Sequence, residues 1–202
     1  NNEFDTIYHE HFSYFSFITV QKIFNSHDLE IFDVEEISTH GGSLRIFIKH
    51  HDNQQYQIND SIENLIKKER DHGLDKISTY QNFSEKIQNV KKKLNEFVES
   101  ANKEGKSIVC YGAPAKGNTL LNFCEIDKQQ IDFVVDRSPY KQGLFLPGSH
   151  IPIKSVEAIQ EAKPDYIIIL PWNIKDEIME QISFVNNWGG KFVIPIPEVK
   201  IL

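Results

Sequence analysis

The chain has 202 residues, of which 40% are hydrophobic, and its formal net charge is −7 at pH 7. This apolar content supports a packed core and excludes wholesale disorder, and the length fits one large domain or one and a half ordinary ones. Acidic and basic residues are interspersed, which argues against a general nucleic-acid binder with a basic face. No apolar stretch approaches the ~20 residues that a membrane-spanning helix needs.

The ends of the chain and its cysteines add three expectations. The chain starts at Asn1 and has one methionine, Met179, so we expect it to be a piece of a longer polypeptide. The N-terminus has no signal-peptide pattern. Cys110 and Cys124 form no CxxC pair, and no spacing predicts a metal site in this chain. A reducing, cytoplasmic setting is expected.

The first hundred residues predict a helix, a strand pair and a long helical connector. Residues 14–27 carry apolar side chains at helical spacing, with Ser13 as the expected N-cap. The segments 29–34 and 44–48 are predicted strands, the second because Leu44, Ile46 and Ile48 alternate with Arg45, Phe47 and Lys49, as in a half-buried strand. We expect the two strands to pair antiparallel. From about Asn59 to Lys103 one apolar stripe at three- and four-residue steps, from Ile77 to Val98, predicts helix.

After Gly105 the pattern changes to apolar strands that alternate with helices. Strands are expected at 107–112, 131–136, 165–170 and 191–194, with one helix from about Lys116 and another after the third strand. This order predicts a mostly parallel, Rossmann-like sheet with both faces covered. The expected domains are therefore 1–52, a connector at 53–104, and an α/β domain at 105–202.

The stretch Tyr8-His9-Glu10-His11 is the most informative in the chain. If it is helical, Tyr8 and His11 share a face. A phenol beside an imidazole can remove a proton from carbon and stabilise the resulting oxyanion. A polar start to an amphipathic helix explains the same residues equally well.

The loop from Tyr111 to Thr119 joins the first strand of the expected sheet to its helix, where α/β folds bind ligands. Lys116 would add a positive charge to a helix N-terminus that attracts anions. The loop fails the GxGxxG pattern at Pro114, and it fails the P-loop pattern because Lys116 precedes Gly117. A tight turn without a ligand is the alternative. The strand-loop-helix pattern together with Asp136, which ends the next strand, would also fit a nicotinamide-dependent oxidoreductase.

Five segments together resemble the S-adenosylmethionine-dependent sugar C-methyltransferases. They are 4–15 (Phe4-Asp5-Thr6-Ile7-Tyr8-His9-Glu10-His11-Phe12-Ser13-Tyr14-Phe15), 39–45 (Thr39-His40-Gly41-Gly42-Ser43-Leu44-Arg45), 111–118 (Tyr111-Gly112-Ala113-Pro114-Ala115-Lys116-Gly117-Asn118), 136–139 (Asp136-Arg137-Ser138-Pro139) and 170–173 (Leu170-Pro171-Trp172-Asn173). They span nearly the whole chain in the expected order. As a set they are specific to that family.

The resemblance implies a three-part enzyme: a small zinc-binding domain, a methyltransferase domain that binds S-adenosylmethionine, and a C-terminal domain that holds a nucleotide-linked sugar. This chain then contains the end of the middle domain, which carries the catalytic motif in 1–52, and the whole C-terminal domain. It lacks the Gly-rich S-adenosylmethionine loop and the zinc cysteines. We therefore expect the 202 residues alone to be inactive in methyl transfer.

In that family the substrate is a nucleotide-diphosphate 4-keto-deoxysugar. A base removes the proton at C3, and the enediolate attacks the methyl group of the sulfonium. By resemblance His11 is the expected base, Tyr8 the donor or proton relay, and Glu10 the residue that orients a neighbour or holds the sugar. The sequence does not decide between Tyr8 and His11 as the base, and His9 is expected to be structural.

The expected substrate-binding residues fall into two groups. His40, Gly41, Gly42 and Arg45 would lie near the sugar, or would form a plain strand turn. Around the nucleotide and diphosphate we expect Tyr111, Lys116, Gly117, Asn118, Asp136, Arg137 and, more weakly, Lys141. The alternatives to a methyltransferase are an NAD-dependent oxidoreductase and a non-catalytic nucleotide-binding module. The sugar, the nucleotide base, the pathway and the oligomeric state are not determined by the sequence.

Overall fold

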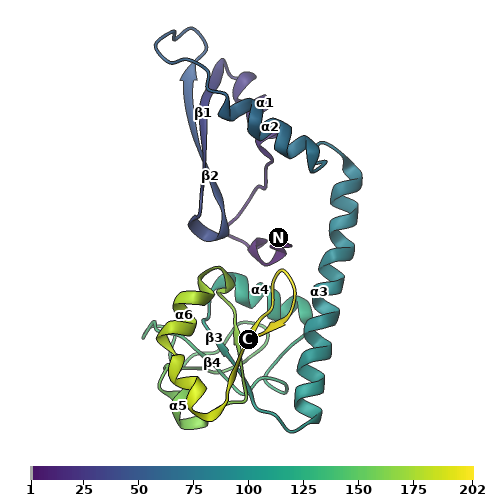
Figure 1. The fold of residues 1–202 in the computed structure, drawn as a ribbon, viewed down its shortest axis with the longest axis vertical. Coiled ribbons are helices and arrows are strands. Elements are labelled where there is room, and N and C mark those ends of the chain that lie inside the picture. Colours follow the sequence, from purple (N-terminus) through teal and green to yellow (C-terminus); the bar gives the residue numbers. More distant parts are fainter. Residues whose placement is uncertain (1) are drawn as a thin grey trace. The chain divides into compact units, whose positions relative to one another are not determined.

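The computed structural model describes residues 2–202, apart from the side chain of His40. These residues divide into two compact units (Figure 1). The hairpin unit is Phe12–Ser84, and the α/β unit comprises the residues up to His11 together with Glu85–Leu202. Each unit has its own apolar core. The predicted boundaries at 52 and 104 stay predictions.

The hairpin unit packs two helices against an antiparallel strand pair (Figure 1). Its elements are α1 (Phe17–Asn25), β1 (Leu29–Ile37), η2 (Thr39–Gly41), β2 (Ser43–His50) and α2 (Ser61–Asp71). The predicted antiparallel pairing is confirmed, with a register shift between Ile31 and Asp33. Phe17, Ile31 and Ile62 are buried in the core that these elements share.

Helix α1 begins later than its apolar pattern predicts. Its N-cap is Ser16, whose side chain accepts the N–H of Thr19, and not Ser13. Glu69 of α2 adds a second cap, because its carboxylate accepts the N–H groups of Phe17 and Ile18 at 2.6 and 2.9 Å. The preceding aromatic residues are exposed, so Phe17 is the first side chain that anchors the helix in the core.

The predicted helical stretch from Asn59 to Lys103 is two helices, because the chain turns at Gly73, where φ is +72°. The second helix is α3 (Ile77–Lys103). Its apolar stripe is buried only in the second half, at Val90, Leu94 and Val98, whereas Ile77 is 74% exposed. Only this second half lies against an apolar core in the α/β unit.

The α/β unit is built on a mostly parallel sheet, as predicted. Among the described residues six strands follow the order β5-β4-β3-β6-β7-β8, and all neighbours are parallel except the edge pair β7 and β8. The strands are β3 (Ile108–Tyr111), β4 (Val134–Val135), β5 (Ile153–Lys154), β6 (Tyr166–Ile169), β7 (Lys191–Ile194) and β8 (Lys200–Ile201). The expected strand at 131–136 shrinks to β4, although ladder hydrogen bonds run from Asp132 to Asp136.

Helices cover both faces of this sheet (Figure 1). The helical elements of the unit besides α3 are η1 (Phe4–Thr6), α4 (Ala115–Cys124), α5 (Ala158–Ala162), η3 (Trp172–Ile174), α6 (Lys175–Gln181) and η4 (Ser183–Trp188). Val109 and Ile167 pack into one buried cluster with residues of α5, α6 and η4. Their neighbours Cys110 and Ile168 are also fully buried and, by strand alternation, face the other side. No helix within residues 2–202 has the length and apolar character needed to cross a bilayer.

Candidate functional site

Tyr8 and His11 come together in a turn and not in a helix. The backbone N–H of His11 donates to the carbonyl of Tyr8 at 3.0 Å, which closes the turn. The two rings lie 4.3 Å apart between centroids with an interplanar angle of 35°. Glu10 and His9 are exposed, with 4.0 Å between a carboxylate oxygen of Glu10 and Nε2 of His9. The predicted phenol and imidazole therefore form one adjacent pair.

A backbone carbonyl holds the imidazole of His11. Its Nδ1 lies 2.8 Å from the carbonyl oxygen of Thr6. A carbonyl oxygen can only accept a hydrogen bond, so Nδ1 carries the proton in this contact. In the neutral ring the lone pair is then on Nε2, which is the atom that can take a proton from a substrate.

Thr6 belongs to η1, and two side chains of η1 attach it to the rest of the α/β unit. The ring of Phe4 packs against Phe123 of α4, with 4.9 Å between centroids. The carboxylate of Asp5 is fully buried and accepts the indole N–H of Trp172 at 2.7 Å. Trp172 begins η3, just after β6, so the turn that carries Tyr8 and His11 follows directly on a segment fixed at the carboxyl end of a central strand.

Lys116 lies in the first turn of α4, beside the same indole. Its ammonium group is 4.5 Å from the centroid of the Trp172 ring and donates a hydrogen bond to the side-chain oxygen of Asn173. Burial lowers the pKa of Lys116, and the nearby carboxylates of Asp5 and Glu3 oppose that shift. A half-buried cation at a helix N-terminus is suited to bind an anion such as a phosphate.

Asn118 follows Gly117 on α4, and its side-chain oxygen is an acceptor that is not used within the described residues. Its Oδ1 is buried and has no hydrogen-bond partner among residues 2–202. Buried polar atoms in proteins are nearly always hydrogen-bonded. Oδ1 of Asn118 is therefore an acceptor that a substrate could use, on the same helix as Lys116.

Two glycines let the strand-to-helix turn pack against the segment after β6. Gly112 has φ at +86°, and a Cβ there would lie 2.6 Å from the ring of Pro171. A Cβ on Gly117 would lie 2.8 Å from the Cβ of Leu170. The absence of a side chain at Gly117 is thus required by packing, whatever contact its backbone makes with a ligand.

Asp136 and Lys141 hold the backbone that follows β3. One carboxylate oxygen of Asp136 accepts the N–H of Ala113 at 2.7 Å, and the other accepts the N–H of Ser138 at 2.8 Å. Lys141 donates to the carbonyl of Ala113 at 2.9 Å. Both side chains form hydrogen bonds that hold the turn. Asp136, the residue that suggested a nicotinamide cofactor, therefore has a structural role.

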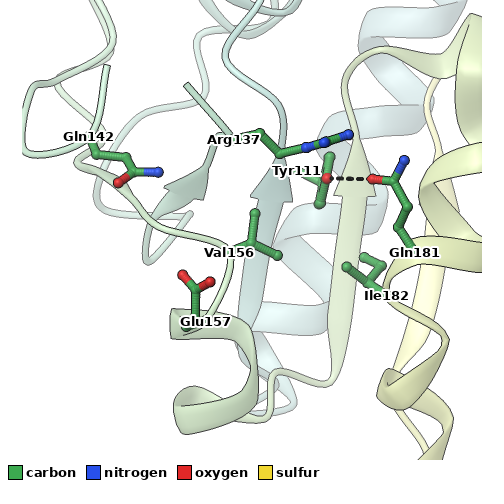
Figure 2. A pocket seen from close by; sticks show the side chains of 7 residues that line it. All are labelled: Tyr111, Arg137, Gln142, Val156, Glu157, Gln181 and Ile182. Carbon is green, nitrogen blue, oxygen red and sulfur yellow. Dashed lines mark hydrogen bonds between the residues drawn. The ribbon is translucent and has the colours of Figure 1, made fainter. Parts of the chain in front are cut away.

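Tyr111 and Arg137 line a separate open pocket beyond β3 and β4, with a volume of about 340 Å³ (Figure 2). The pocket is lined by Tyr111, Arg137, Gln142, Val156, Glu157, Gln181 and Ile182. The phenol of Tyr111 donates to the side-chain oxygen of Gln181 at 3.2 Å, and burial raises the pKa of this phenol. Lys116 and Asn118 are not among its lining residues.

Three further polar residues of this pocket, Gln142, Glu157 and Gln181, were not predicted from the sequence. Gln142 and Glu157 lie in the connections that follow β4 and β5, and Gln181 ends α6. None belongs to a motif with a recognisable spacing. Gln142 follows β4, which lies within the predicted strand at 131–136, and this position was the signal that could have indicated it. Glu157 follows the two-residue strand β5, which the sequence does not predict.

The remaining predicted residues belong to the hairpin unit. Gly41 and Gly42 have φ values of +92° and +131° in the connection between β1 and β2, a conformation that favours glycine. The exposed side chain of Arg45 donates to Glu35 across the strand pair at 3.0 Å. The side chain of His40 lies outside the described residues.

The residues of this chain do not fit either expected cofactor. Cys110 and Cys124 are buried, and burial raises the pKa of both thiols, that of Cys124 to about 12, so neither is a ready thiolate ligand for zinc. Within residues 2–202 no three His, Cys, Asp or Glu side chains gather as a metal site. The ring of Pro171 occupies the space beside Gly112 in the turn after β3. This turn also lacks the further glycines of an S-adenosylmethionine loop.

Comparison with known proteins identifies the family. Residues 38–197 match the family model of the C-methyltransferase C-terminal domain. The chain belongs to this C-methyltransferase family. It is also 38% identical over 203 residues to C-methyltransferase NovU of Streptomyces niveus, an alignment that covers 100% of this chain and 48% of that protein. The chain thus spans about half the length of its C-methyltransferase relative, and the resemblance inferred from the motifs is confirmed.

Proposed function

We propose that the chain is the C-terminal portion of an S-adenosylmethionine-dependent C-methyltransferase that acts on a nucleotide-diphosphate 4-keto-deoxysugar. The observation that carries this proposal is the pairing of Tyr8 with His11 directly after a segment fixed to Trp172, at the edge of the sheet where Lys116 lies. Membership in the C-methyltransferase family supports the reaction class.

The chemistry that we propose for this pair is removal of the proton at C3 of the sugar. The adjacent ketone acidifies that proton, and Nε2 of His11 would accept it, since the contact of Nδ1 with Thr6 leaves the lone pair on Nε2. The phenol of Tyr8 would donate a hydrogen bond to the ketone oxygen as negative charge develops there. The reverse assignment, with Tyr8 as the base, stays open. Glu10 would orient a neighbour or bind a sugar hydroxyl.

The nucleotide-diphosphate portion would bind along the carboxyl edge of the sheet. Lys116 and the N-terminus of α4 would contact the diphosphate, and Oδ1 of Asn118 would accept one hydrogen bond from a donor group of the substrate. The pocket of Tyr111 and Arg137 would hold the nucleoside. For Gly117, Asp136 and Lys141 the proposed role is to shape the turn, and for His40, Gly41, Gly42 and Arg45 a substrate contact stays a prediction.

The methyl donor and the zinc ion would be bound by parts of the protein outside this chain. S-adenosylmethionine, when bound, supplies an electrophilic methyl group. The residues of this chain bind the nucleotide sugar, orient its ring and hold the proton taken from carbon. We place the enzyme in the cytoplasm, with a nucleotide sugar and neither nucleic acid nor membrane as its partner.

Calorimetric titration of residues 1–202 with a thymidine diphosphate sugar tests the binding half of this proposal. We expect saturable heat with a dissociation constant below 1 mM, roughly −4 kcal/mol or stronger. No heat at millimolar ligand would contradict it. Saturable binding of NAD without a response to the nucleotide sugar would favour an oxidoreductase instead.

A further inference from the structure

Burial of the Asp5 carboxylate costs free energy, and the hydrogen bond from Trp172 does not fully offset that cost. Its side chain is 0% exposed, and Oδ1 has no hydrogen-bond partner among residues 2–202. Burial raises the pKa of Asp5, against the hydrogen bond from Trp172 and the charge of Lys116. A half-satisfied buried carboxylate is expensive, and such violations of local rules are concentrated at functional sites.

Asp5 also links two motifs that lie far apart in the sequence. Its partner Trp172 is 167 positions away, and the face of the same indole supports the ammonium of Lys116. In the other direction the backbone passes from Asp5 to Thr6, whose carbonyl holds Nδ1 of His11 at 2.8 Å. One side chain thus connects the sheet edge to the imidazole.

We infer that Asp5 is a positioning residue: its hydrogen bond to Trp172 fixes η1 so that the carbonyl of Thr6 holds His11 in the Nδ1–H tautomer. The reacting nitrogen, Nε2, is then presented to the substrate before it arrives. This inference rests on the proposed function for its purpose. The hydrogen-bonded arrangement itself can be tested without any substrate.

The test is the tautomer of His11, read by long-range ¹H–¹⁵N NMR of the histidine-labelled chain at a pH where imidazoles are neutral. The His11 signals are assigned by their absence in His11→Gln. In the unsubstituted chain we expect Nδ1 to resonate as a protonated nitrogen and Nε2 as an unprotonated one. A predominantly Nε2–H ring would overturn the inference.

Two substitutions break the link from opposite ends. Asp5→Ala removes the acceptor, and Trp172→Phe removes the donor while it keeps an aromatic face for Lys116. Both should convert His11 to a mixture of tautomers. Asp5→Asn keeps an acceptor and should restore at least half of the Nδ1–H signal, whereas Asp132→Ala, at an exposed position, should change nothing. An unchanged tautomer in both Asp5→Ala and Trp172→Phe, with circular dichroism that shows folded protein, would overturn the inference.

A calorimetric arm separates this inference from the proposed function. If the unsubstituted chain binds no nucleotide sugar but shows the expected tautomer and its loss in both variants, the proposed function fails and the positioning role of Asp5 stands.

Discussion

The ring of Tyr8 lies 4.3 Å from the ring of His11, centroid to centroid, although the segment that carries them is a turn. Helical spacing was the reason to expect the two side chains on one face. The turn achieves the same proximity through the hydrogen bond between the backbone groups of these two residues. The pair is therefore a local feature of four consecutive positions, held by its own backbone and by Thr6.

The first prediction concerns His11 in the complete enzyme that we propose. His11→Asn should lower the rate of methyl transfer by about 10²- to 10⁴-fold, the usual contribution of a general base. His9→Asn is the matched control, because His9 is the exposed neighbour in the same motif. A rate for His11→Asn within threefold of the unsubstituted enzyme would remove His11 as the base and favour a non-catalytic module.

The second prediction concerns Lys116. Lys116→Met removes the ammonium but keeps an unbranched chain over the indole of Trp172. Loss of a charge-assisted contact to phosphate costs about 1.5–3 kcal/mol, so calorimetry should show ~10- to 100-fold weaker binding of thymidine diphosphate sugar. Lys128→Met, at an exposed position, should bind as the unsubstituted chain does. Equal binding by both variants would exclude Lys116 as a diphosphate ligand.

The third prediction concerns the cap that Glu69 places on α1. Glu69→Ala leaves the N–H groups of Phe17 and Ile18 without their acceptor. The cost should be about 2–3 kcal/mol, the upper part of the range for hydrogen bonds to a charged group. Amide hydrogen exchange in the first turn of α1 should accelerate by ~30- to 100-fold. Glu63→Ala, exposed on the same helix, should change this exchange by less than about threefold. Equal exchange in the two variants would exclude the cap.

The fourth prediction concerns the acid stability of the α/β unit. Asp165 accepts the backbone N–H and the hydroxyl of Ser107 and pairs with Lys106, and these contacts hold the pKa of Asp165 below its ordinary value. A lowered folded pKa gives stability that is present above the unfolded pKa and is lost as the pH falls through the folded one. Asp165→Asn should therefore cost more stability at pH 7 than at pH 3.

Tryptophan fluorescence during urea unfolding measures this difference, because both tryptophans, Trp172 and Trp188, lie in the α/β unit. Since Asp165 is partly exposed, we expect a difference in unfolding free energy below about 1 kcal/mol at pH 7. Asp132→Asn is the exposed control. A cost of Asp165→Asn that grows as the pH falls would contradict the account.

Much of the fold could be predicted because its strands have distinct local patterns. The buried runs around Val109 and Ile168 are continuous apolar stretches, as parallel strands covered on both faces require. The sequence of β2 also predicts a strand, although its burial does not alternate, because Leu44 and Ile48 are exposed and Lys49 is buried. The two-residue strands β5 and β8 were not predicted, because two residues are too few to show a period.

The parts of the site that could not be predicted depend on contacts between distant positions. In the sequence Asp5 is an ordinary polar residue, and only the fold shows its hydrogen bond with Trp172. In the same way, Glu69 is one of many charged residues on a helix, and only the fold shows that it caps α1. Ser13 and Ser16 are equally good caps by composition. Only the burial of Phe17 decides between them.

The most direct test of the central claim is solvent exchange of the C3 proton of a thymidine diphosphate 4-keto-deoxysugar in D₂O. The complete enzyme is used without its methyl donor, and the C3 signal is followed by ¹H NMR. We predict exchange faster than in buffer alone for the unsubstituted enzyme and for His9→Asn, and exchange near the buffer rate for His11→Asn. Exchange that is as fast with His11→Asn as with the unsubstituted enzyme would contradict the assignment of His11 as the group that removes the proton.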